Sequence, residues 1–333
     1  MTIEMTTTTT IAEFVRANGG AAVLDGIHLP YADAKAGPAA KFGLRAELYL
    51  PDEDRSLLRT QAAEFLHEFW AMFPDQVNEF LQRDKKRSTR FGGDPGAAIE
   101  ADIASSAPKT GYSGALFGRA DIGLPNDDIP VYQANVLVNR AGDSDLSFFD
   151  LSMPLASVSG SLHTVPLLER FLGWCRRFKP RHGSAGFSFI VCPGMSQNSV
   201  YALQLMNRFP GFDFPSAVDF TMEVGGVHDR IKSVNWLTAL GDELVAQLGG
   251  LEMMRQALEP ACTVHGYDGG VVIQAGPTPR LGDTHANDVP AEYRLAARVT
   301  RPVRFEDYDE GLFRVPKELN KRDETLKWIR RFD

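Results

Sequence analysis

The chain has 333 residues, 44% hydrophobic and 23% charged, which is enough for one large domain or two of ordinary size. Its 35 Lys and Arg residues face 43 Asp and Glu residues. The formal net charge of -8 argues against general binding to nucleic acids or anionic membranes, because both need a positive surface. The three cysteines form no CxxC pair, so neither a zinc site nor a disulfide framework is predicted.

The N-terminal segment, residues 1–36, begins with a run of threonines and is expected to be partly flexible. It lacks the basic region and the apolar run of a secretory signal. No later stretch approaches the roughly 20 apolar residues of a membrane span. We therefore expect a cytoplasmic protein.

The next elements form a first group of strands and helices. Lys41–Leu50 alternates as a strand, and the stretch from Leu57 to about Phe73 repeats apolar residues at helical spacing. Short connections join the strand-like runs that follow, and parallel strands would need longer crossovers, so an antiparallel meander backed by the long helix is predicted. The other predicted elements of this group are a helix over Pro95–Ser105 and strands over Tyr112–Ala120, Val131–Asn139 and Leu146–Met153.

A second succession of helices and strands begins at about Leu162. Helices are predicted up to Phe178 and over Ser196–Arg208, Trp236–Leu248, Leu251–Leu258, Ala291–Val299 and Glu318–Phe332. Strands are predicted over Ser184–Val191, Asp219–Glu223, Thr263–Tyr267 and Gly270–Ala275, the last two forming a hairpin around a DGG turn.

These elements predict a mixed α/β protein of the α+β class, with mainly antiparallel sheets packed with helices and two similar-looking halves. Four parts are expected along the chain. They are the N-terminal segment 1–36, a first α/β half over 37–160, a second α/β half over 161–305, and an acidic loop with a C-terminal helix over 306–333.

The motifs of common enzymes are missing from this sequence. GxGxxG, GxxxxGK[ST] and GxSxG do not occur. His182 and Cys192 lie near opposite ends of one predicted strand, roughly 30 Å apart at about 3.3 Å per residue, and cannot form a catalytic pair. We therefore expect no catalytic residue, no cofactor and no enzymatic activity.

Metal ligation remains as an alternative, because two loop-like segments place a carboxylate beside an imidazole. They are His228-Asp229 and Asp283-Thr284-His285. No HExxH or HxH spacing supports either segment, so no metal site is predicted. The alternative function would be a metal-dependent hydrolase that uses His228, Asp229, Asp283 and His285.

Acidic clusters are the other candidates for a functional surface. Phe305–Glu310 (FEDYDE) interleaves four carboxylates with two aromatic rings. A solvated charged surface is one interpretation. The other is an anionic docking face for a basic partner, with Phe305 or Tyr308 as its apolar anchor. The residues of this predicted face are Phe305, Glu306, Asp307, Tyr308, Asp309 and Glu310, followed by the loop pairs Asp127, Asp128 and Asp143, Asp145.

Several segments resemble a known family. They are HGSAGFSFIVCPG at 182–194, RFPGFD at 208–213, NWLTALGDELVAQLGG at 235–250, GGVVIQAGPTPRLGD at 269–283 and VPAEYRLAARVTRPVRF at 289–305. Together they resemble the TsiV/TsiT-like immunity proteins of type VI secretion, which accompany nuclease effectors of the VRR-Nuc and PD-(D/E)xK kind. The resemblance covers roughly residues 40 to 305.

The resemblance implies an immunity protein that binds and neutralises a cognate type VI toxin, a DNase, by blocking its active site or its DNA-binding face. It brings no catalytic residues with it. A DNase must attract phosphate with a basic surface, which an acidic protein can occupy. An adaptor of the secretion machinery is a further alternative, and both a monomer and a homodimer fit the composition.

Overall fold

The computed structural model describes residues 23, 25, 27–31, 38–51, 54–105, 107, 110–118, 129–140, 142–143, 145–155, 167–192 and 195–333. Most of the N-terminal segment 1–36 lies outside the described residues, as do Asp127 and Asp128. The predictions made for them stay predictions.

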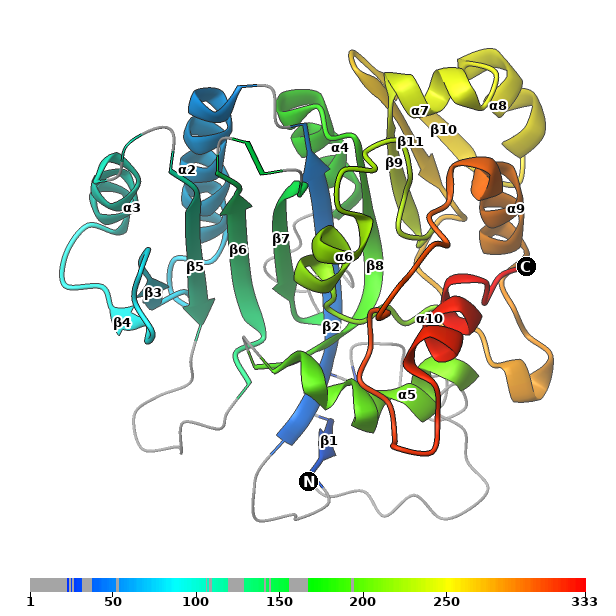
Figure 1. The fold of residues 1–333 in the computed structure, drawn as a ribbon, viewed down its shortest axis with the longest axis horizontal. Coiled ribbons are helices and arrows are strands. Elements are labelled where there is room, and N and C mark those ends of the chain that lie inside the picture. Colours follow the sequence, from blue (N-terminus) through cyan, green and yellow to red (C-terminus); the bar gives the residue numbers. More distant parts are fainter. Residues whose placement is uncertain are drawn as a thin grey trace.

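One antiparallel sheet of 11 strands runs through the described part of the chain (Figure 1). Its order is β10-β11-β9-β8-β2-β7-β6-β5-β3-β4, and β1 pairs with β2 beside this path. The strands are β1 (His28–Pro30), β2 (Pro38–Leu50), β3 (Glu79–Leu81), β4 (Thr89–Arg90), β5 (Tyr112–Gly118), β6 (Tyr132–Val138), β7 (Ser147–Met153), β8 (His182–Ile190), β9 (Leu237–Gly241), β10 (Thr263–Tyr267) and β11 (Gly270–Gln274).

Helices pack against this antiparallel sheet, so the predicted α+β class, with mainly antiparallel strands, is confirmed. They are α2 (Arg55–Met72), α3 (Pro95–Ala104), α4 (Leu167–Phe178), α5 (Ser199–Arg208), α6 (Ala217–Val224), α7 (Asp242–Gln247), α8 (Leu251–Leu258), α9 (Ala291–Thr300) and α10 (Lys321–Ile329). Short 3-10 turns cover Ser196–Asn198, Thr284–Ala286 and Arg301–Val303.

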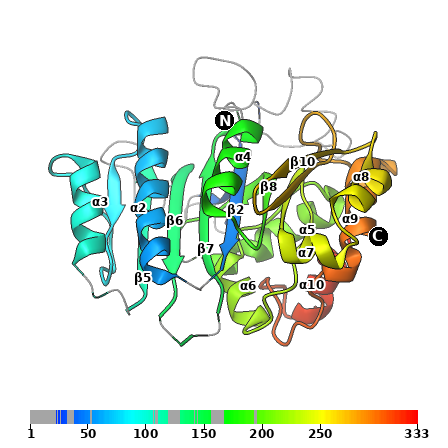
Figure 2. The same ribbon diagram turned by 90° about the horizontal axis from the view of Figure 1, so that it is seen from above.

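The long helix α2 covers one face of the meander together with α4 (Figure 2). Asp54 begins α2 by accepting a hydrogen bond from the Leu57 backbone N–H at 3.0 Å. The helix buries an aromatic stripe, in which Phe65 lies 5.3 Å from the ring of Phe149 on β7. Phe178 of α4 contacts the same ring at 5.5 Å. The predicted meander of β5, β6 and β7 backed by the long helix is therefore confirmed.

The opposite face of the central strands packs against α6. Phe220 of α6 lies 5.0 Å from the ring of Tyr49 on β2 and 5.6 Å from that of His182 on β8. Side chains alternate between the faces of a strand, so Arg45 and Glu47, like Tyr49, point to the α6 side of β2. This strand pairs with both β7 and β8. It thereby joins the two predicted halves in one sheet, while the boundaries drawn between them stay a prediction.

Two elements of the second half differ from the prediction. The start of the predicted helix Trp236–Leu248 is strand β9, which lies between β11 and β8 with every residue buried. A strand covered on both faces has no polar alternation, so its apolar run is easily mistaken for a helix. The predicted strand Asp219–Glu223 belongs to α6, which buries Phe220 and Val224 at helical spacing and ends at Gly225 with φ 48°.

Candidate partner-binding surface

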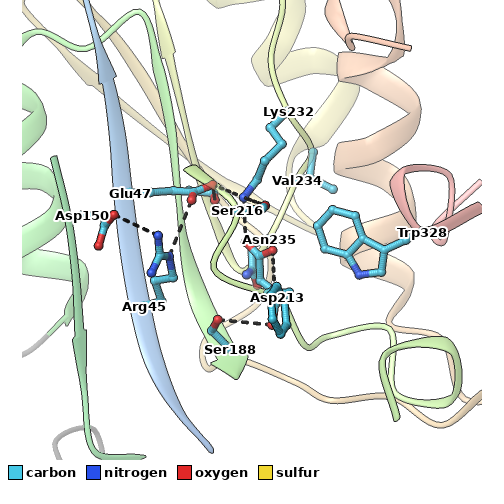
Figure 3. Close-up of polar contacts among 12 residues, drawn as sticks. Arg45, Glu47, Asp150, Ser188, Asp213, Ser216, Lys232, Val234, Asn235 and Trp328 are labelled. Carbon is cyan, nitrogen blue, oxygen red and sulfur yellow. Dashed lines mark hydrogen bonds and ion pairs between the residues drawn. The ribbon is translucent and has the colours of Figure 1, made fainter. Parts of the chain in front are cut away.

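A group of charged side chains, here called the buried charge cluster, lies on the α6 side of β2 (Figure 3). Its members are Arg45, Glu47, Asp150, Asp213 and Lys232, none of them more than 8% exposed. Arg45 Nη2 lies 3.0 Å from Asp150 Oδ2, and Arg45 Nε lies 3.6 Å from Glu47 Oε2. The Lys232 ammonium contacts the Glu47 carboxylate and lies 3.4 Å from Asp213 Oδ2.

The cluster holds three carboxylates and two cations, so it carries one excess negative charge when every member is ionised. Burial raises the pKa of Glu47, against the opposing effect of Lys232 and Arg45. Neighbouring polar groups satisfy further lone pairs. Asn135 donates to Asp150 at 2.8 Å, and the Phe214 backbone N–H donates to Asp213 at 2.7 Å. The cluster thus joins β2, β7 and the segments that flank α6.

His182 lies next to this cluster and is held in its neutral form. Its ring stacks on Tyr49 at 4.4 Å, and its side chain is buried. Burial, followed by the charges of Lys232 and Arg181, lowers the pKa of His182 to about 3. The imidazole is therefore neutral over the range in which general acid–base catalysis operates.

A cleft of about 380 Å³ opens between α6 and the face of β6 and β7 that α2 does not cover. Its floor is polar and includes Arg45 and Asp150 of the buried charge cluster, together with Gln133 and Asn135. The sheet also contributes the ring of Phe148, and the remaining lining includes the apolar side chains of Val191, Pro215 and Ala217. Its size falls in the range of sites that bind small groups or anchoring side chains.

The mouth of the cleft carries exposed apolar side chains. Met222 is 64% exposed, Val218 is 52% exposed and Met195 is 37% exposed. Val218 and Met222 lie one turn apart on α6 and therefore share a helix face. Asp219, on the same helix, is a half-buried lining residue of the cleft. Burial raises the pKa of this carboxyl group.

The acidic segment Phe305–Glu310 is fixed against the protein by its aromatic residues. Phe305 is 6% exposed and Tyr308 is fully buried. Phe305 packs edge-on to Phe220 of α6 at 6.1 Å. Both rings belong to the core, so neither is presented to a partner as the apolar anchor that the sequence predicted. The exposed apolar groups next to the segment are instead those of α6.

The four carboxylates of this segment differ in their ion pairs and in their exposure to solvent. Glu306 forms ion pairs with Arg304 and Arg330, and these hydrogen bonds outweigh burial and lower its pKa. Asp307, Asp309 and Glu310 are exposed. We call these three residues the acidic edge. They are the members of the predicted segment that a partner can reach.

Glu223 at the end of α6 joins the acidic edge to the helix. Its carboxylate accepts hydrogen bonds from the backbone N–H groups of Asp309 at 2.8 Å, Glu310 at 3.0 Å and Gly311 at 2.7 Å. These hydrogen bonds hold the acidic edge against the C-terminal end of α6, the helix that also carries the exposed side chains of Val218 and Met222. We call the acidic edge and these two side chains together the α6 surface.

The other predicted acidic pair lies in the turn between β6 and β7. Asp143 is exposed and accepts a hydrogen bond from the Arg140 backbone N–H at 3.1 Å. Asp145 is half-buried, and its backbone carbonyl accepts from the Asn139 side chain at 2.9 Å. Both residues shape their own turn.

The residues proposed for the metal alternative have other partners. Asp283 accepts two hydrogen bonds from the Arg208 guanidinium, each at 3.0 Å, and a third from the His285 backbone N–H. Asp229 pairs with its neighbour Arg230 at 2.5 Å. Within the described residues, no three His, Cys, Asp or Glu side chains gather as a metal would require. A metal-dependent hydrolase therefore has no support.

Comparison with known proteins decides the family. The model of the TsiV family, described as type VI immunity for VRR-NUC, matches residues 121–332, which is more than half of the chain. The chain belongs to the TsiV family. The matched range contains α6, the acidic edge, and the cluster members Asp150, Asp213 and Lys232, whereas β2 precedes it.

The fold is also found in a solved structure. This chain is similar to the Pseudomonas aeruginosa T6SS protein PA0821, with a TM-score of 0.73 and 23% sequence identity over 88% of this chain and 84% of that chain. At this identity the likeness shows the fold alone. Among curated proteins none matches.

The family match thereby confirms the family predicted from the sequence, and with it the function of an immunity protein against a nuclease effector. The comparisons support neither the hydrolase nor the adaptor alternative. None of the described helices is long and apolar enough to cross a bilayer. Sequence reasoning missed the buried charge cluster and the cleft, and the one local signal for them was the placement of Arg45 and Glu47 on one face of a central strand.

Proposed function

We propose that this protein binds a cognate VRR-NUC nuclease of type VI secretion and inhibits it stoichiometrically, by covering its active site or its DNA-binding face. The match to the TsiV family carries this proposal. Inhibition by binding needs no catalytic residue and no cofactor, and we propose neither. The site of action would be the cytoplasm of the producing cell, where the nuclease would meet the cell's own DNA.

Charge complementarity supports this mode of action. A nuclease binds the DNA backbone through a basic surface, because neutralised phosphates release counterions. The inhibitor has a net charge of -8 and presents three exposed carboxylates on its acidic edge beside exposed apolar groups of α6. Carboxylates around an apolar centre suit a protein interface, because the charges speed association and the apolar groups slow dissociation. We therefore propose the α6 surface as the docking face.

A rescue experiment in cells tests the proposed function. The cognate nuclease is expressed from an inducible promoter, alone or together with this protein. We expect that expression alone breaks chromosomal DNA and stops growth, and that co-expression restores both. A catalytically inactive nuclease is the control for toxicity unrelated to cleavage. Unchanged DNA breakage in the presence of folded, abundant protein would contradict the proposal.

A further inference from the structure

The cleft beside α6 has the form of a receptor for a single anchoring side chain. The cleft has a volume of about 380 Å³, with the sheet on one side and α6 on the other. The sheet lines the cleft with the polar side chains of the floor and with the ring of Phe148, and Val191 and Pro215 add further apolar surface. An elongated side chain with an apolar stem and a polar head matches this arrangement, as those of arginine and lysine do.

The charge of the cleft selects a cationic head. Its charged lining residues are Arg45, Asp150 and Asp219, which sum to a net negative charge. Arg45 does not repel an incoming cation strongly, because Asp150 lies 3.0 Å and Glu47 lies 3.6 Å from its guanidinium. Asp219 is half-buried at the mouth, where burial raises its pKa although the charges of Lys321 and Arg314 act in the opposite direction. A cation bound there would compensate the cost of burying this carboxylate.

The exposed methionines around the mouth of the cleft, here called the rim, indicate that the cation belongs to a protein. Met195 and Met222 stand at the mouth, and methionine side chains adapt to irregular partner surfaces. A free small cation would leave these side chains in water, whereas a protein surface covers them. The acidic edge is held at the end of the same helix by the hydrogen bonds of Glu223, so a basic partner would meet both.

We propose that the cleft beside α6 receives one arginine or lysine side chain from the DNA-binding surface of the cognate nuclease. The inference rests on the proposed function and deepens it by naming the contact. The head of the basic side chain binds between Asp219 and the polar floor, and its stem lies along Phe148 and Pro215. That side chain is then withdrawn from the DNA phosphates, so the contact competes directly with substrate.

The test uses opposite charges at one exposed position. Met222→Lys places a cation at the mouth, and Met222→Glu places an anion there. We expect Met222→Lys to weaken nuclease binding by about tenfold or more, as for a hot-spot contact. Met222→Glu should bind more tightly than Met222→Lys. Met253→Lys is the matched control, since Met253 on α8 is also an exposed methionine, at 59%, and it should stay within about twofold of the wild type.

A double-mutant cycle then identifies the occupant. Surface arginines and lysines of the nuclease are replaced by alanine, one at a time, and each variant is combined with Asp219→Asn. One basic residue should show a coupling to Asp219 that the others lack. Binding of the wild type together with equal binding of both Met222 variants would overturn the inference while leaving the proposed function intact. Failure of the wild type to bind would overturn both.

Discussion

Lys232 is the residue whose loss should damage the protein most. Its ammonium contacts Glu47 and lies 3.4 Å from Asp213, in a site where its side chain is 1% exposed. Lys232→Met leaves two buried carboxylates without this cation, so we expect the free energy of unfolding to fall by about 3–5 kcal/mol. Urea denaturation measures the change.

The neighbouring carboxylate provides the internal check on this prediction. Adding Glu47→Gln to Lys232→Met removes one of the stranded charges and should restore part of the lost stability. Lys327→Met is the matched control, because Lys327 is 59% exposed and only pairs with Glu324 on the same helix. A double variant no more stable than Lys232→Met would show that charge stranding is not the cause.

His182 should make the stability depend on pH. Its folded-state pKa is lowered to about 3, below the unfolded value of about 6.5, so the unfolded chain binds more protons between these values. The contribution of His182 is fully present above pH 6.5 and is lost as the pH falls toward 3. The slope approaches about 1.4 kcal/mol per pH unit.

Comparison with His182→Phe isolates this effect from other titrating groups. Phenylalanine keeps an aromatic ring against Tyr49 and Phe220 but takes up no proton. As the pH falls from 6.5 to 4.5, the unfolding free energy of the wild type should therefore decrease more than that of His182→Phe. A difference that does not vary with pH would mean that His182 is not kept neutral.

At the scale of elements, the contact between β8 and the segment before β9 depends on a glycine. A Cβ atom at Gly186 would lie 2.1 Å from Oδ1 of Asn235, whose amide is held by a hydrogen bond to the Trp236 backbone N–H. Gly186→Ala should therefore cost about 1–3 kcal/mol of stability. Gly173→Ala should instead stabilise by about 0.5–1 kcal/mol, because Gly173 lies inside α4 and nothing is within 4 Å of its Cβ position. Thermal unfolding of both variants tests this pair, and a tolerated Gly186→Ala would contradict it.

Local patterns were sufficient for most elements but not for the site. The helix α2 and the hairpin of β10 and β11 followed from helical spacing and from a DGG turn. Strand β9 was missed because burial on both faces removes its alternation. The buried charge cluster brings together Glu47, Asp213 and Lys232, which lie far apart in the sequence. Only the path of the sheet places them side by side, so the charges on one face of β2 signal a polar site but cannot name its partners or the cleft beside it.

At the scale of the whole molecule, the acidic edge should control the rate of association with the nuclease. We expect reversal of Asp307, Asp309 and Glu310 to lysine to slow association by about tenfold at low salt, with a smaller effect at high salt. Reversal of Glu100, Glu252 and Glu259, which are exposed on α3 and near α8, changes the net charge equally and is the control. Stopped-flow or biosensor kinetics measure both. Equal slowing by the two sets would show that net charge, and not this edge, directs the encounter.

We propose that this TsiV-family protein stops a VRR-NUC nuclease by binding to it. The most direct test titrates the purified protein into a fixed concentration of the cognate nuclease and follows DNA cleavage. We expect cleavage to fall in proportion to the added protein and to end when the two are equimolar, since a tight stoichiometric inhibitor leaves no free enzyme. Cleavage that continues undiminished in a large excess of folded protein would contradict the account.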